Sequence, residues 1–351
     1  MNVKKLGIIG MIICMSVLFL SACGRQEQDG PDQLHVGVAC YNQSDTFLSE
    51  LLTCFKEDIN ALERDDLEAT VTIRDAAASQ RTQNDQVKEL INAGCNVLCV
   101  NLVDRADPSE IIDLARDNDV PIVFFNREPV AEDMMQWDGL YYVGADAEQS
   151  GVMQGELAAE VIKANSQIDR NNDGKIQYVV LEGETGHQDA IIRTEKAVET
   201  LKINGVELEK LSYGMANWNR AQAQNRMQQM ISQYGNKIEL VLANNDDMAI
   251  GALEAYEKIN FTESALPVFL GIDGTDVGLK AVRDLKLAGT VYNDKEGQAA
   301  AMAQLVVALV TGEGMDKIKF IDDKYIYLSY SKITSENVGD FLSEEETALQ
   351  Q

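Results

Sequence analysis

Residues 169–177 place oxygen-bearing side chains at alternate positions around a glycine, a pattern typical of a loop that binds a metal ion. The run reads Asp169, Arg170, Asn171, Asn172, Asp173, Gly174, Lys175, Ile176 and Gln177. Calcium takes carboxylate, amide and carbonyl oxygens, and the glycine permits a tight bend. An EF-hand loop would end with a bidentate glutamate at residue 180, but that residue is valine. The pattern therefore predicts a calcium loop completed by a distant carboxylate, with a solvated Asn/Asp turn as the alternative.

Polar and aromatic side chains also follow the segments expected to form strands. They are Tyr41 through Asp45 with Phe47, Asn101 and Asp104, Asn126, Asn244 through Asp246, Asp273, and Asn293 with Asp294. The segment 186–189 adds His187 and Asp189, with Arg193 close behind. Ligands of open α/β sheets bind beyond the carboxyl ends of the strands. Together these groups suit an uncharged polyol, because they can pair with its hydroxyls and cover its C–H faces. Any one of them alone is more often a turn former or a helix cap.

Short apolar runs alternate with helix-length amphipathic segments along most of the chain. The expected strands are 34–39, 69–75, 97–101, 122–126, 141–144, 176–182, 207–213, 240–244, 268–273 and 290–293. The expected helices include 46–62, 82–93, 108–117, 150–165, 189–203, 219–233, 247–259 and 277–287. This alternation predicts an α/β fold of right-handed βαβ units with parallel sheets. Neither a Gly-x-Gly-x-x-Gly turn after the first strand nor a phosphate loop is present, so nucleotide binding has no support.

The N-terminus has the pattern of a lipoprotein signal peptide. Two lysines at 4–5 precede an apolar run over 6–20, and Leu20-Ser21-Ala22-Cys23 follows. We expect residues 1–22 to be removed and Cys23 to carry lipid, so that the protein is extracytoplasmic and held at the membrane by that lipid alone. The alternative is an ordinary signal with a chance cysteine. The polar residues 23–33 are expected to be a tether, and folded structure is expected to begin near Leu34.

The remaining length and charge limit the class of protein. About 310 residues follow the tether, enough for two α/β domains. Removal of Lys4 and Lys5 changes the formal charge from −27 to about −29, which excludes nucleic acid as a partner.

Four cysteines remain after Cys14 leaves with the signal and Cys23 is lipidated. These four are Cys40, Cys54, Cys95 and Cys99, and they show no metal-ligand spacing. We expect them to be buried small hydrophobic residues, and a disulfide between two of them stays open.

Several of these segments together resemble the galactose/glucose-binding branch of the type I periplasmic binding protein family. They are the run 34–47, NDQ at 84–86, NLVD at 101–104, FFNREP at 124–129, YYVG at 141–144, GHQD at 186–189, ANND at 243–246 and VYND at 291–294. The similarity extends from about residue 34 to 341. It implies two doubly wound parallel-sheet domains joined by a three-segment hinge and closing over one sugar. The implied lobes are 34–144 plus 293–328 and 145–292 plus 329–343, with 344–351 as a tail.

The resemblance also implies which residues bind the ligand and the metal. Residues implied to hydrogen-bond a hexose are Asp45, Asn126, His187, Asp189, Arg193, Asn245, Asp273 and Asn293. Phe47 and Trp218 are implied to sandwich the sugar ring. The implied calcium ligands are Asp169, Asn171, Asp173, the Lys175 carbonyl, Gln177 and, as the remote carboxylate, Glu239. Lys175 replaces a glutamine of the family, a small change because that position contributes its backbone oxygen.

The expected function is capture of galactose or glucose and delivery to the permease subunits of an ABC importer, by a protein that is a monomer and no enzyme. Related transcriptional regulators carry an N-terminal helix-turn-helix where this chain has a signal and lipobox. A sugar-sensing subunit for a receptor is a second possibility that the residues do not separate from transport. A secreted glycoside hydrolase using Asp45, Asp189 or Asp273 is a third, but the closing cleft leaves no subsite for a leaving group.

Overall fold

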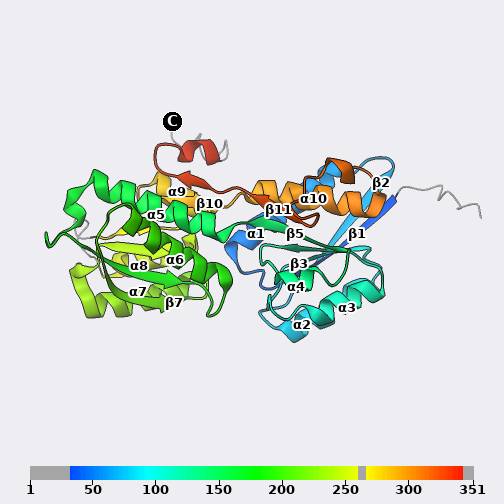
Figure 1. The fold of residues 1–351 in the computed structure, drawn as a ribbon, viewed down its shortest axis with the longest axis horizontal. Coiled ribbons are helices and arrows are strands. Elements are labelled where there is room, and N and C mark those ends of the chain that lie inside the picture. Colours follow the sequence, from blue (N-terminus) through cyan, green and yellow to red (C-terminus); the bar gives the residue numbers. More distant parts are fainter. Residues whose placement is uncertain (1–31, 260–265, 343–351) are drawn as a thin grey trace, which may run out of the picture.

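Apolar β-branched runs form two parallel sheets whose central strands are buried on both faces. In the computed structural model, which describes residues 32–259 and 266–342, the first sheet has the order β11-β5-β4-β3-β1-β2 (Figure 1). All its neighbouring strands are parallel. The strands are β1 (Asp32–Cys40), β2 (Leu67–Asp75), β3 (Val97–Val100), β4 (Ile122–Phe125), β5 (Leu140–Ala145) and β11 (Tyr325–Leu328).

Helices cover both faces of this sheet and complete the first lobe. The helices α1 (Thr46–Leu62) and α10 (Lys295–Thr311) share one core cluster with the sheet. The helices α2 (Gln80–Asn92) and α3 (Ser109–Asp117) and the short α4 (Ala131–Met134) share the other. The covered faces explain why β3 and β4 are buried at every residue.

The second lobe repeats the same layered arrangement. Its sheet has the order β7-β6-β8-β9, built from β6 (Ile176–Glu182), β7 (Leu208–Met215), β8 (Leu240–Ala243) and β9 (Val268–Leu270). The helices α5 (Ala147–Ala164) and α6 (Gln188–Ile203) pack against one face. The helices α7 (Arg220–Tyr234), α8 (Asp246–Lys258) and α9 (Asp276–Arg283) pack against the other.

The chain passes between the lobes in three places among the described residues. It crosses from β5 to α5, from β10 (Thr290–Tyr292) to α10, and from β11 to β12 (Ser331–Ile333). The strands β10 and β12 pair antiparallel with each other, so two of the crossing segments lie side by side in Figure 1. The prediction of two doubly wound α/β domains is confirmed.

The observed elements differ from the expected ones in a few places. The helix α1 has the expected bounds, whereas β1 begins at residue 32 rather than 34 because Asp32 and Gln33 still pair with β2. The helix α10 and the strands β11 and β12 are missing from the expected set. The strand β11 is half-buried throughout and forms by pairing with β5, far away in sequence, so local pattern alone carries little signal for it.

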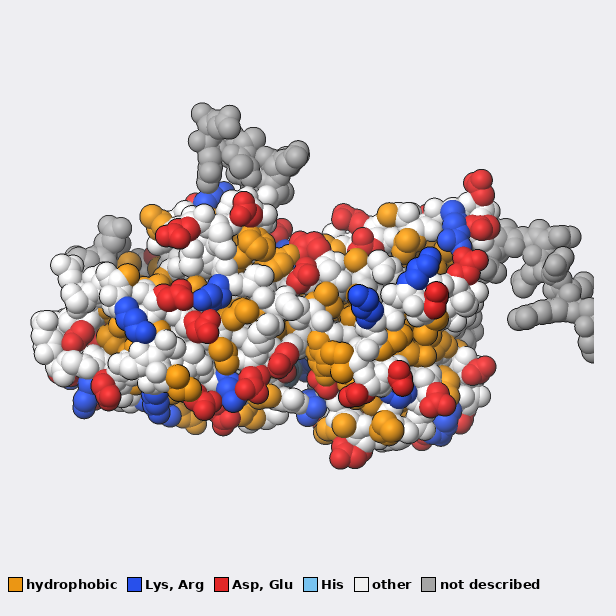
Figure 2. Space-filling view, turned by 45° about the horizontal axis from the view of Figure 1, so that its top comes forward, with side chains coloured by type: hydrophobic (Ala, Val, Ile, Leu, Met, Phe, Trp, Pro, Cys, Tyr) orange, Lys and Arg blue, Asp and Glu red, His pale blue; other side chains and the backbone are white. Residues whose placement is uncertain are grey.

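The described cysteines form no disulfide, and charged side chains lie on the surface of both lobes (Figure 2). The four described cysteines are free; three are buried and Cys54 is half-buried. No helix in the described ranges is long and apolar enough to cross a membrane. On the face shown in Figure 2, acidic side chains spread over both lobes with basic ones scattered among them. The predicted signal 1–22, Cys23 and the tail 344–351 lie outside the described residues.

Candidate functional site

The carboxyl ends of strands from both sheets meet at a cavity between the lobes. The loops after β1 and β4 contribute from the first lobe, and the loops after β6, β7, β8 and β9 contribute from the second. The cavity is lined by Tyr41, Asp45, Phe47, Asn126, Arg127, His187, Asp189, Arg193, Trp218, Asn245 and Asp273. These side chains combine hydrogen-bonding groups with aromatic rings, which suits a small polar ligand with apolar patches.

Asp45 presents a carboxylate from the N-terminus of α1. As the N-cap, it accepts a hydrogen bond from Leu48 N through Oδ1 at 3.0 Å, and Oδ2 accepts one from the Tyr41 hydroxyl at 2.7 Å. Burial raises the pKa of Asp45, although both hydrogen bonds oppose that shift. The carboxylate is thus held in one orientation while keeping lone pairs for a ligand.

Asn126 offers a donor from the same lobe. Its φ of 60° places it in the left-handed region, which asparagine tolerates better than most residues. Its Oδ1 accepts a hydrogen bond from Asn101 Nδ2 at 3.0 Å, and its carbonyl accepts one from the Tyr142 hydroxyl at 3.0 Å. This arrangement leaves the Asn126 Nδ2 group for the cavity.

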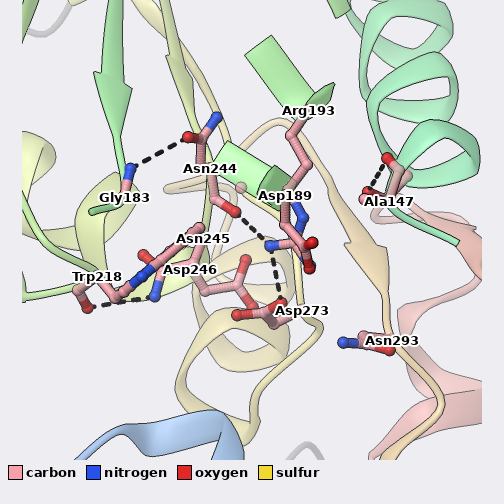
Figure 3. A network of polar contacts seen from close by, with 12 residues as sticks. Ala147, Gly183, Asp189, Arg193, Trp218, Asn244, Asn245, Asp246, Asp273 and Asn293 are labelled. Carbon is pink, nitrogen blue, oxygen red and sulfur yellow. Dashed lines mark hydrogen bonds and ion pairs between the residues drawn. The ribbon is translucent and has the colours of Figure 1, made fainter. Parts of the chain in front are cut away.

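Arg193 is the buried cation of the second lobe. Figure 3 shows it reaching from α6 toward Asn244 and Asp273. Its Nη1 donates to the Asn244 carbonyl at 2.7 Å and lies 3.3 Å from Asp273 Oδ1. Its Nη2 donates to the Tyr330 hydroxyl at 3.2 Å, while its buried Nε has no acceptor among the described residues. Burial raises the pKa of Asp273 well above its usual range, and Arg193 opposes that shift.

His187 and Asp189 begin α6 at the edge of the cavity. His187 Nδ1 accepts a hydrogen bond from Asp189 N at 3.2 Å, so its proton resides on Nε2. Burial, with nearby Arg127 and Arg193, lowers the pKa of His187 to about 2. The imidazole is therefore a neutral donor. Burial also raises the pKa of Asp189.

Trp218 supplies an aromatic face through an unusual turn. Asn217 and Trp218 have φ values of 50° and 60°, and Asn245 Nδ2 donates to the Trp218 carbonyl at 3.2 Å. A Cβ on Gly183 would lie 2.1 Å from the indole, so only glycine leaves room for the ring there. The His187 ring meets the indole edge-on at a centroid distance of 5.1 Å.

Direct contacts across the cleft hold the two lobes together in this structure. Thr46 on α1 donates to Asp247 on α8. Glu50 on α1 accepts from Asp276 N on α9 at 3.1 Å, and Lys295 pairs with both Glu50 and Asp276. The two lobes therefore touch each other directly beside the cavity.

Comparison with known proteins identifies the family to which this fold belongs. A family model described as a periplasmic binding protein domain matches residues 36–314. The chain belongs to the periplasmic binding protein family. This family is made of sugar-binding proteins of ABC transport rather than enzymes, and this periplasmic binding protein is likewise no enzyme. The hydrolase alternative is thereby set aside.

Two relatives and one solved structure illustrate the similarity. The D-galactose/methyl-galactoside binding periplasmic protein MglB of Haemophilus influenzae is 35% identical, covering 94% of this chain and 98% of the relative. A putative rhizopine-binding protein of Rhizobium meliloti is 29% identical, covering 77% and 81%. An ABC transporter solute binding protein of Bacillus halodurans, solved with myo-inositol, superposes with a TM-score of 0.72 at 28% identity, covering 91% and 98%.

Of the ten predicted ligand residues in this periplasmic binding protein, nine line the cavity, and Asn293 is not among its lining residues. Asn293 is buried; its N–H donates to the Asp273 carbonyl at 2.9 Å and its Oδ1 accepts from Gln298 Nε2 at 2.7 Å. Two cavity residues escaped prediction, Tyr41 and Arg127. Tyr41 stood among the polar residues after the first strand, and Arg127 adjoins Asn126, so chain proximity was the available signal.

The predicted metal ligands lie at the opposite end of β6 from the cavity. Glu239 is buried, and its two carboxylate oxygens accept from Arg170 N at 2.7 Å and Gln177 N at 2.9 Å. Asn171 Nδ2 and Gln177 Nε2 both lie 3.0 Å from Asp173 Oδ2. Asp169, Asn171, Asp173 and Gln177 are linked to one another by hydrogen bonds within this loop, and carboxylate and amide oxygens of this kind fit a calcium ion. In the described part of the chain, no three His, Cys, Asp or Glu side chains form a metal cluster by themselves.

Proposed function

We propose that this chain is an extracytoplasmic, lipid-anchored protein that captures D-galactose or D-glucose between its lobes and delivers it to an ABC importer. The observation that supports the proposal most is the cavity, where Phe47 and Trp218 come from opposite lobes and hydrogen-bonding groups surround them. An aldohexose has no charge, several hydroxyls and apolar ring faces. The printed ligand of the Haemophilus influenzae relative is of this class.

The site chemistry follows from the state of each group. His187 Nε2–H, Asn126 Nδ2 and the Arg193 guanidinium donate to sugar hydroxyls, while Asp45, Asp189 and Asp273 accept. Hydrogen bonds to charged partners are the stronger ones, and they gain further where water is excluded. Galactose and glucose differ in the direction of the 4-hydroxyl. A carboxylate such as Asp45, with two acceptor oxygens, can serve either epimer.

A thermal-shift screen of monosaccharides tests the ligand class. A ligand that binds only the native state raises stability by RT ln(1 + [L]/Kd), about 2.7 kcal/mol at a hundredfold excess over Kd. We expect galactose and glucose to raise the melting temperature most. Ribose, xylose and 2-deoxyglucose should raise it much less, because they leave buried polar groups unpaired. A larger shift with myo-inositol than with either hexose would instead favour a cyclitol.

Membrane anchoring is expected to depend on Cys23, which the lipobox places at the mature N-terminus. Cys23→Ala should release the protein from the membrane fraction without changing its melting temperature or its sugar affinity, because Cys23 precedes β1 in the sequence and is not among the predicted sugar-binding residues. Fractionation followed by immunoblotting measures the release. Cys54→Ala is the matched control and should stay anchored. Retention of Cys23→Ala on membranes would remove the lipobox interpretation.

We further propose that the loop 169–177 and Glu239 hold a structural calcium ion. Asp169, Asn171, Asp173, the Lys175 carbonyl, Gln177 and Glu239 would be its ligands. When bound, calcium supplies a positive charge that neutralises the loop carboxylates and ties the loop to the segment before β8. The loop ends in the first residues of β6, whereas Gly183 and Glu184 follow the strand, and seven strand residues span about 23 Å. The metal site is thus remote from the sugar cavity.

Removal of calcium is expected to lower stability and leave sugar binding intact. Millimolar calcium should raise the melting temperature of chelator-treated protein by several degrees, since a ligand of the native state stabilises by mass action. Glu239→Ala should abolish this calcium-dependent increase, whatever its effect on stability without metal. Glu257→Ala, an exposed carboxylate of the same lobe, should keep the increase. An identical melting curve of the parent with calcium and with chelator would refute the metal site.

A further inference from the structure

Arg127 lines the cavity, and its guanidinium donates hydrogen bonds to protein groups of both lobes. It follows β4 and is buried, with 5% of its surface exposed. Its Nη1 donates to the Val103 carbonyl at 3.0 Å, within its own lobe. Its Nη2 donates to the Glu184 carboxylate at 3.0 Å, and Glu184 belongs to the other lobe. A buried arginine bonded in this way to both sides of a cleft joins them directly.

The guanidinium also supports the acceptor side of the cavity. Its Cζ lies 3.6 Å from the centroid of the Tyr41 ring, a distance at which cation–π attraction is strong in a water-poor site. The Tyr41 hydroxyl in turn donates to Asp45 Oδ2 at 2.7 Å. Arg127 therefore fixes the ring that fixes the Asp45 carboxylate.

Glu184 is in direct contact with His187, a hydrogen-bond donor of the cavity. Its carbonyl accepts the His187 N–H at 3.1 Å, so the backbone of Glu184 forms the turn that starts α6. Its carboxylate is about a third exposed, at the rim where the lobes meet. The Arg127–Glu184 pair thus connects the segment that orients Asp45 with the segment that orients His187.

The other contacts across the cleft are made by residues that do not line the cavity. Thr46, Asp247, Glu50, Asp276 and Lys295 bridge the lobes without lining the cavity. Only Arg127, among the described residues, both lines the cavity and carries an interlobe ion pair. Its contacts with the second lobe must lengthen if the cleft opens, because Val103 and Tyr41 hold it on the first.

We propose that Arg127 and Glu184 form an interlobe latch that sets how long the ligand stays bound, with Arg127 also a positioning residue for Asp45 through Tyr41. The proposal rests on the proposed function for the identity of the ligand, but the pairing itself does not. The Arg127 guanidinium is buried, so breaking its pair with Glu184 leaves that charge unpaired and acts chiefly on dissociation. The latch therefore controls the dissociation rate and favours the closed form in the absence of sugar.

Stopped-flow fluorescence with the sugar that binds best tests the latch. Glu184→Gln keeps the side-chain shape and should speed dissociation at least tenfold, with association changed less than threefold. Arg127→Met should do at least as much, and Arg127→Lys should recover part of the loss because it restores the charge. The double variant should dissociate no faster than Arg127→Met. A double variant whose effect equals the product of the single effects would overturn the latch.

A ligand-free readout separates failure of the latch from failure of the proposed function. Small-angle X-ray scattering without sugar should give a larger radius of gyration for Glu184→Gln and Arg127→Met than for the parent. Arg220→Met is the control, because it breaks an arginine–glutamate pair with Glu254 inside one lobe, and it should leave both readouts unchanged. If no sugar binds, the proposed function fails, and the scattering measurement alone tests the latch. Equal radii for parent and latch variants would then reject the latch.

Discussion

Arg193→Met is expected to lower the free energy of unfolding by about 3–5 kcal/mol and to abolish measurable sugar binding. Arg193 is 4% exposed, and its Nη1 lies 3.3 Å from the Asp273 carboxylate, which is also buried. Removing one partner of a buried pair leaves the other charge desolvated and unpaired, which carries a cost of that size. The Asn244 carbonyl and the Tyr330 hydroxyl also lose their donor.

The measurements for Arg193→Met are urea denaturation and titration calorimetry on the same preparation. Arg226→Met is the matched control, since Arg226 is exposed and, within the part of the chain that the structure describes, donates only to the Met215 carbonyl. It should change stability by less than about 0.5 kcal/mol and leave affinity unchanged. The double variant Asp273→Asn/Arg193→Met replaces both members of the ion pair by neutral residues. It should be more stable than Arg193→Met alone. If Arg193→Met binds sugar like the parent, the guanidinium does not belong to the site.

Trp218→Ala is expected to weaken galactose and glucose binding in similar proportion, by about 2 kcal/mol or more, roughly thirtyfold. The indole is an aromatic face of the cavity, and the loss removes apolar contact that both epimers share. The positive φ values at 217 and 218 and the close approach of the indole to Gly183 show that the turn holds the ring in place. The affinity loss is measured by calorimetry.

The chain carries its own control for the indole. Trp137, the other of the two tryptophans, lies in the first lobe and does not line the cavity, so Trp137→Ala should bind sugar like the parent. Intrinsic fluorescence gives an independent check. Trp137→Phe should keep any sugar-dependent change in emission, and Trp218→Phe should lose it. A fluorescence response that follows Trp137 would place the sugar elsewhere.

The sequence predicted the layered fold because its signals are local. Buried strands such as β4 and β8 are continuous apolar runs, and helices such as α1 begin at side chains that cap them, here Asp45. Elements that depend on distant partners were missed. The strand β11 pairs with β5, more than 170 residues earlier, and no local pattern encodes that pairing.

The candidate site could be predicted as far as residue types at strand ends and the family resemblance allowed. Nine of the ten predicted residues line one cavity, and Asn293, which is not among the lining residues, bonds Gln298 through Oδ1 and the Asp273 carbonyl through its backbone N–H. The Arg127–Glu184 pair could not be predicted from the sequence. Nothing in the spacing of two residues on different lobes indicates that they meet, since their separation depends on how the lobes close.

Titration calorimetry of the mature protein with D-galactose and D-glucose tests the proposed function most directly. The cavity predicts one sugar bound per chain, a dissociation constant of about 1 μM or lower, equivalent to about −8 kcal/mol, and competition between the two epimers. It also predicts a negative heat-capacity change, since binding buries ring faces against Phe47 and Trp218. No heat with either hexose, together with clear binding of ribose, an amino acid or an oligosaccharide, would contradict the assignment.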